Sequence, residues 1–200
     1  YKEEFPEGDI DRKVIQTDYV EGAKGYENFN VLFESCKNQT PISFVHYSYT
    51  KRIFNAAIVH PIRLKEFDNK WYLIGYSENH KGLRTFGLDR IYEPILLKRK
   101  FISCNEKEIE SYCNDIYGVY PIENQKKQEI TFLTSPTITN YFEAYPIHPS
   151  QKEKKNESGS SYFTINVVPS MELIKLFRSY GKHLEVINPN WLRQQTQSLK

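Results

Sequence analysis

The sequence predicts an α+β protein built from two successive modules. Residues 42–92 alternate apolar and polar side chains with a period of two, which is typical of short β-strands. Residues 128–192 instead alternate strand-like and helix-like segments. With 200 residues, of which 39% are hydrophobic, the chain can bury a real core and is not a wholly disordered protein.

The first module combines one helix with several short strands. Tyr26, Phe29, Leu32 and Cys36 recur at steps of three or four residues, so we expect an amphipathic helix that ends near Lys37. The strands are expected at residues 42–49, 54–60 (with a continuation to 64 left open), 71–76, 83–86 and 88–92. Because closure removes the unpaired edges of such short strands, we interpret this module as a small β-barrel.

The second module has a different order of elements. After a connecting helix at 106–117, the expected elements are a strand at 128–134, a helix at 136–144, a short strand at 145–148, a polar loop at 150–161, a strand at 162–168, a helix at 170–180, a strand at 183–187 and a last helix opened by Pro189. Strand–helix–strand twice in succession is the βαββαβ order of ferredoxin-like domains. The predicted divisions are a linker (1–20), the barrel with its leading helix (21–103), a helical connector (104–124) and the ferredoxin-like domain (125–200).

Basic residues gather in the barrel module. Residues 51–100 hold eleven Lys and Arg against five Asp and Glu, whereas the remainder holds 16 against 20. This segment fits an anionic partner, and a solvated basic surface is the alternative. The three cysteines form no paired motif, and no apolar run approaches the roughly 20 residues of a membrane span. We therefore expect a cytoplasmic protein with no membrane partner.

The sequence lacks the common catalytic motifs. GxSxG, HExxH, GxGxxG and the phosphate-binding P-loop are absent. The five histidines do not pair with Cys or with one another at metal-ligand spacing. We expect a protein that is not an enzyme and that has no metal site and no cofactor.

Arginines and aromatic residues are interleaved in the second half of the barrel module. On the strand at 71–76, alternation places Tyr72 and Tyr76 on the face opposite Trp71. Guanidinium groups beside aromatic rings suit phosphates and stacked bases. The alternative is that the rings form core and that the arginines pair with Asp89 or Glu93.

This segment resembles a WYL domain, whose signature is Trp71-Tyr72-Leu73. Three companion motifs occur in order around that signature. They are an Ile-x-Phe-x-x-Tyr strand (Ile42, Phe44, Tyr47), a His60-Pro61 pair followed by Leu64, and the Arg-x-Phe-x-Leu-Asp-Arg-Ile run from Arg84 to Ile91. Residues 125–200 are similar to the C-terminal extension that follows many WYL domains.

The resemblance implies a bacterial transcriptional regulator. In that family, an Sm-like/SH3-type barrel and a ferredoxin-like extension usually follow a winged helix-turn-helix that binds DNA. They are thought to sense a ligand, with a nucleotide or single-stranded nucleic acid as the favoured candidates. Because the chain begins with Tyr1 rather than Met, we expect a fragment whose DNA-binding domain is missing. The family's ligand positions map onto Tyr47, His60, Arg63, Tyr72, Tyr76, Arg84 and Arg90.

Two functions remain open. In the first, Arg84 and Arg90 clamp anionic oxygens, and binding changes the geometry of a homodimer and so moves the DNA-binding domains. Gly87 stands where many relatives have another Arg, which removes one guanidinium fork and leaves open whether Arg84 and Arg90 face the same way. In the alternative, the chain is a protein-interaction module without a ligand, and its tyrosine-rich surface mediates oligomerisation.

Overall fold

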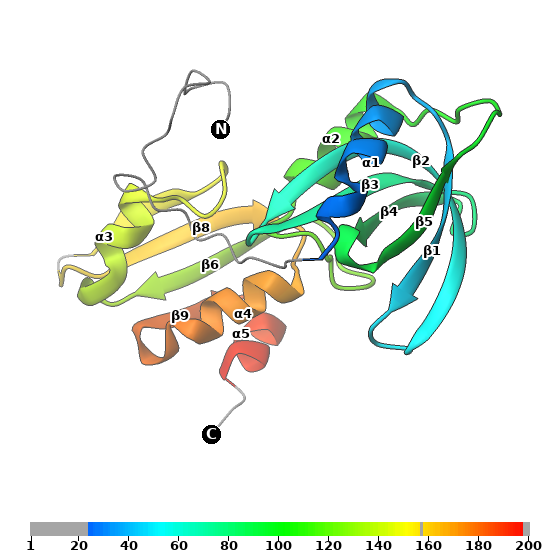
Figure 1. Ribbon diagram of the computed structural model, residues 1–200. Helices are drawn as coiled ribbons and strands as arrows, with labels where there is room; N and C mark the ends of the chain where they lie inside the picture. Colours follow the sequence, from blue (N-terminus) through cyan, green and yellow to red (C-terminus); the bar gives the residue numbers. More distant parts are fainter. Residues whose placement is uncertain (1–23, 157, 198–200) are drawn as a thin grey trace, which may run out of the picture.

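The computed structural model describes residues 24–156 and 158–197, so the predicted linker at 1–20 lies outside the described residues. Within these ranges the chain forms two antiparallel sheets, each with its own helices, and this confirms the α+β class. Figure 1 shows the two modules side by side. None of the described helices is both long and apolar enough to cross a membrane.

The first module is a five-stranded sheet with the order β4-β3-β2-β1-β5. Its strands are β1 (Ile42–Ser48), β2 (Ile53–Phe67), β3 (Lys70–Ser77), β4 (Gly82–Gly87) and β5 (Ile91–Leu96). β2 is longer than the sequence predicts because it serves two partners: residues 53–59 pair with β1 and residues 59–67 pair with β3. One bulge, between Pro61 and Arg63, shifts the register of the second pairing.

The described strands form an open, curled sheet rather than a closed barrel, because β4 and β5 are its two edges. The expected strand at 88–92 begins instead with a 3₁₀ turn, η2 (Leu88–Arg90), which separates β4 from β5. The curl is nevertheless strong. The Phe86 ring on β4 lies 5.2 Å from the Phe44 and His46 rings on β1, although β3 and β2 stand between those strands in the sheet.

Two helices cover this sheet. A short 3₁₀ turn, η1 (Tyr26–Asn28), leads into α1 (Phe29–Lys37), which buries Leu32 in the core and sets Phe29 against Trp71 with 4.9 Å between the ring centroids. α2 (Glu106–Asn114) is shorter than predicted and packs Ile109 and Cys113 against Ile74 of β3. β3 is therefore buried on both of its faces.

The second module has a four-stranded antiparallel sheet with the order β7-β8-β6-β9. Its elements are β6 (Gln128–Thr134), α3 (Pro136–Ala144), β7 (Lys152–Lys155), β8 (Ser161–Val167), α4 (Met171–Ser179), η3 (Gly181–His183), β9 (Leu184–Asn188) and α5 (Asn190–Gln197). Alternate residues of β6 and β8 are buried, and Phe132 and Phe163 pack there with Phe142 of α3 and Phe177 of α4.

The strand expected at 145–148 is wrong, and β7 lies in the segment predicted as a polar loop. All four residues of β7 are exposed, and they pair only with β8. A lysine-rich edge strand of this kind has no apolar alternation to reveal it, and its charges protect the sheet edge.

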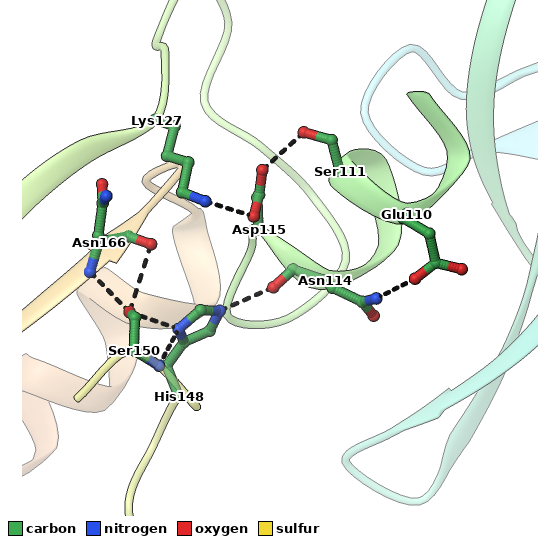
Figure 2. Close-up of polar contacts among 8 residues, drawn as sticks. All are labelled: Glu110, Ser111, Asn114, Asp115, Lys127, His148, Ser150 and Asn166. Carbon is green, nitrogen blue, oxygen red and sulfur yellow. Dashed lines mark hydrogen bonds and ion pairs between the residues drawn. The ribbon is translucent and has the colours of Figure 1, made fainter. Parts of the chain in front are cut away.

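The connector is tied to the second module by polar contacts (Figure 2). His148 Nε2 lies 2.7 Å from the carbonyl oxygen of Asn114, which can only accept, so Nε2 carries the proton and Nδ1 accepts from the Ser150 hydroxyl at 2.7 Å. Lys127 Nζ donates to Asp115 Oδ1 at 2.7 Å. On its other side α2 faces the first sheet, where Arg63 of β2 pairs with Glu110.

Candidate functional site

A pocket of about 590 Å³ opens between β1, the first half of β2 and β4. Its lining contains lysine, arginine and histidine side chains and no carboxylate. The residues are His46, Ser48, Lys51, Phe54, Asn55, Ala56, Ala57, Asn79, His80, Arg84, Thr85 and Phe86. We call this the basic pocket.

Two hairpin turns supply the polar rim of the basic pocket. Because successive antiparallel strands alternate in direction, the β1–β2 and β3–β4 turns lie at the same end of the sheet, and they bring Lys51, Asn79 and His80. Asn79 Oδ1 accepts a hydrogen bond from the backbone N–H of Ile58 at 3.2 Å, which fixes that turn against β2. The rim thus comes from two turns, and Asn79 fixes one of them to the backbone of β2.

Arg84 is the arginine of the basic pocket. Its Nη1 donates to the backbone carbonyl of Leu83 at 2.7 Å, and no carboxylate in the described ranges pairs with it. The pKa of His80 is lowered by burial first and then by the positive charges of Arg84 and Lys51. His80 is therefore neutral at neutral pH, and the two permanent cations of the pocket remain uncompensated.

His46 contributes a ring nitrogen without a hydrogen-bond partner to the same pocket. Its Nε2 is buried and has no hydrogen-bond partner among the residues that the structure describes. Burial, and then the charge of Arg90, lowers the pKa of His46 to about 4, so the ring is neutral at pH 7. A buried ring nitrogen without a partner costs free energy, and a hydrogen bond from a ligand or water would offset that cost.

His60 lies elsewhere and is held by the protein on both ring nitrogens. Its side chain is fully buried, and Nδ1 accepts from the backbone N–H of Ile102 at 2.9 Å. Nε2 consequently carries the proton and donates to Glu78 Oε1 at 2.9 Å. His60 thereby anchors the segment that leads from β5 to α2.

Three further predicted residues also have protein partners. Arg63 pairs with Glu110 and with Glu106, the latter at 3.2 Å, so its guanidinium is engaged by α2. The Tyr76 ring lies 6.0 Å from the His60 ring, and the Tyr47 ring lies 4.7 Å from Phe54, its cross-strand neighbour.

Arg90 and Tyr72 face the connector instead of the basic pocket. Arg90 lies between two tyrosine rings, 5.0 Å from the centroid of Tyr49 and 5.7 Å from that of Tyr120, and it donates to the Tyr120 hydroxyl and to Asp89. The Tyr72 ring lies 5.8 Å from that of Tyr120. A Cβ on Gly87 would come within 2.5 Å of Arg90 Nη2, so a larger residue at position 87 would displace this guanidinium.

Of the seven predicted ligand residues, the structure brings Arg84 alone into the basic pocket. Sequence patterns did not predict several polar residues of the lining, namely His46, Ser48, Lys51, Asn55, Asn79 and His80. The available signal was hairpin geometry, since it places both turns at one end of the sheet. No group of three or more His, Cys, Asp or Glu side chains in the described part of the chain could hold a metal ion.

Two family models match the sequence in succession. The WYL domain matches residues 27–95, and the WCX domain matches residues 126–199, so together they cover more than two thirds of the chain. The chain thus contains a WYL domain followed by a WCX domain. The basic pocket therefore lies in the WYL domain, and the second sheet with its helices is the WCX domain.

Two solved structures are similar to the chain at low sequence identity. A CRISPR Cas-related protein aligns over 88% of this chain with 13% identity and a TM-score of 0.59, which shows a shared fold. Proteasome accessory factor B/C (PafBC) of Arthrobacter aurescens aligns over 92% of the chain with 15% identity and a TM-score of 0.40. The chain spans 50% and 28% of the lengths of these two proteins. No functionally curated protein matches the sequence significantly.

Proposed function

We propose that this chain is the effector-sensing part of a bacterial transcriptional regulator, with no catalytic activity of its own. The effector is a nucleotide or a segment of single-stranded nucleic acid, and it binds in the basic pocket of the WYL domain. The observation that carries this proposal is the presence of Arg84 and Lys51 in one pocket without a carboxylate in its lining. Uncompensated cations in a concave site attract phosphate.

The pocket offers a group for each part of such a ligand. Arg84 and Lys51 would bind phosphate oxygens, and the Phe54 ring, which is 63% exposed, would stack on a base. His46 supplies the ring nitrogen that lacks a partner, and a small shift of the ring would aim it at a ligand. Of the predicted ligand residues, Arg84 is therefore retained as a direct ligand contact. His60 and Arg63 instead make the protein contacts described above.

We further propose how binding reaches the rest of the protein. Thr85 lines the basic pocket, and its hydroxyl lies 3.1 Å from the Tyr112 hydroxyl on α2, which also contacts the WCX domain. An effector that favours one position of α2 would change the geometry of a homodimer, and this would move the N-terminal DNA-binding domains relative to each other.

The fold assignments support the same proposal. We propose that the curled sheet, with the leading helix, is the Sm-like/SH3-type module of residues 21–103. The βαββαβ order and the sheet order β7-β8-β6-β9 favour a ferredoxin-like domain over residues 125–200, with residues 104–124 as connector.

The binding site is tested by fluorescence anisotropy with a labelled oligothymidylate and by competition with mononucleotides. Arg84→Ala should weaken binding at least about tenfold, because it removes a charge-assisted contact. Arg63→Ala is the matched control and should bind within about twofold of wild type, since α2 already engages that guanidinium. Equal binding by wild type and Arg84→Ala, or no binding of any anionic ligand, would contradict the proposal.

Salt dependence gives a second readout of the same contacts. If Lys51 and Arg84 each neutralise one phosphate, the log–log slope of affinity against salt should be about −1.4, and Arg84→Ala should halve it. A flat profile would mean that binding rests on stacking or on a neutral effector.

The alternative function, an interaction module without a ligand, is favoured by exposed apolar side chains on two strands. Phe54, Tyr92 and Ile95 are exposed on β2 and β5, with Phe54 and Tyr92 5.7 Å apart at their ring centroids. Analytical ultracentrifugation distinguishes the two: a tight dimer that binds no nucleotide supports the alternative.

A further inference from the structure

A second cavity, of about 700 Å³, lies between the WYL and WCX domains and is separate from the basic pocket. We call it the interdomain cavity. Tyr72 and Arg90 line it from the WYL domain, Tyr117 and Tyr120 from the connector, and Glu172 and Lys175 from α4. Any molecule bound here would touch both domains at once.

Glu172 is the unusual residue of this cavity. Its Oε2 is buried and accepts no hydrogen bond from the described residues, a property shared only with His46 Nε2 in that part of the chain. The side chain lies against Gly118, where an added Cβ would be 2.7 Å from Glu172 Cβ. A carboxylate that is partly removed from water and receives no hydrogen bond raises the free energy of the folded state, and a ligand that donates to it would lower that free energy.

The Lys65 ammonium, on whose pKa the charge of Glu172 acts, already has protein partners. Its Nζ donates to the carbonyl oxygens of Gly118 at 2.8 Å and Cys113 at 3.0 Å. Arg90 is likewise engaged by Asp89. The protein therefore leaves Glu172 without a direct ionic partner among the described residues.

Three tyrosine rings stand around this carboxylate, and its charge acts on each of them. Burial is the main cause that raises the pKa of Tyr72 to about 12, and it also raises the pKa of Tyr117 and Tyr120. The phenols are consequently neutral, with intact hydroxyl groups and electron-rich ring faces. Such faces attract cations, and Tyr is among the residues that do so most effectively.

We propose that the interdomain cavity binds a small organic ammonium ion, with its charged nitrogen on Glu172 and its apolar body against Tyr72, Tyr117 and Tyr120. The lining also holds three cations, Lys70, Arg90 and Lys175, and two further carboxylates, Asp68 and Asp89, of which Asp89 is paired with Arg90. By spanning the two domains, a bound ammonium ion would stabilise one of their relative positions.

The test is an NMR titration of the whole chain labelled with ¹⁵N. The probes are n-butylammonium chloride, sodium n-butyrate and n-butanol, which share an alkyl body and differ in charge. n-Butylammonium should shift amide signals near Glu172 and Tyr120 in a saturable way, and Glu172→Gln should weaken this binding at least about tenfold. Glu129→Gln, which removes an exposed carboxylate from β6, is the matched control and should leave the binding unchanged.

Three outcomes would overturn the proposal. They are absence of saturable binding, equal binding of n-butyrate or n-butanol, and equal binding of n-butylammonium by wild type and Glu172→Gln. A urea titration without ligand checks that the variant is folded: Glu172→Gln should unfold cooperatively with a midpoint close to that of wild type, because the relieved desolvation offsets the helix-dipole interaction lost from the first turn of α4.

Discussion

Protonation of His46 should destabilise the WYL domain below about pH 6.5. The pKa of this imidazole is about 4 in the folded chain and 6.5 when it is exposed, and burial is the main cause. Between these two values the unfolded chain binds more protons than the folded one. Stability from this residue is therefore complete above pH 6.5 and is lost as the pH falls toward 4.

The size of the effect follows from the same two values. Over the interval from pH 7 to pH 5, the full shift would cost about 2 kcal/mol of unfolding free energy, and the partial exposure of the side chain reduces this to about 1 kcal/mol. A change of this size is within reach of urea titration, whose midpoint moves in proportion.

The assay compares urea unfolding at pH 7 and pH 5 for wild type and two variants. His46→Phe keeps an aromatic ring against Phe86 and should lose about 1 kcal/mol less than wild type on acidification. His80→Gln is the comparison, because it removes a largely exposed histidine from the same pocket and should retain most of the acid sensitivity. If His46→Phe is as acid-sensitive as wild type, buried His46 does not cause the effect.

Two further substitutions test the packing described above. Gly75→Ala should lower the free energy of unfolding in urea by at least about 2 kcal/mol, because the added Cβ would lie 2.6 Å from Val59 Cγ1 and 2.7 Å from the His60 carbonyl oxygen. Gly82→Ala is the control: its Cβ would have no atom nearer than 3.9 Å, and it should cost less than half as much. Ser170→Ala should cost about 1–2 kcal/mol, because the buried hydroxyl caps α4 by accepting from the N–H of Leu173 at 3.0 Å and also donates to the carbonyl of Tyr117. A Ser170→Ala variant as stable as wild type would contradict the capping argument.

Periodicity predicted most of the fold because most elements have one buried face. Phe132 and Phe163 alternate with half-buried or exposed neighbours, so the strands that carry them are visible in the sequence. β7 is not visible, since all of its residues are exposed. The length of β2 and the curl of the sheet also escaped prediction, because they depend on pairing between residues far apart in the chain.

The candidate site was harder to predict than the fold. The family positions identified residues that share a sheet, but the 3₁₀ turn at Leu88–Arg90 interrupts the strand alternation, and Arg84 and Arg90 line two different cavities. The sequence also does not reveal which charges are neutralised. Arg63 and Arg84 look alike in the sequence, and only the position of α2 shows that Glu110 engages the former.

The double role of α2 has a consequence for dividing the protein into parts. Its Ile109 and Cys113 complete the cluster on the outer face of β3, while Ile116, just beyond the helix, bridges to Val168 of the WCX domain. A truncation placed before α2 would leave Ile74 facing water, and one placed directly after it would remove a neighbour of Val168. Either truncation of the WYL domain would therefore expose an apolar side chain. The hydrophobic contacts of the domain extend beyond the point where its sequence match ends.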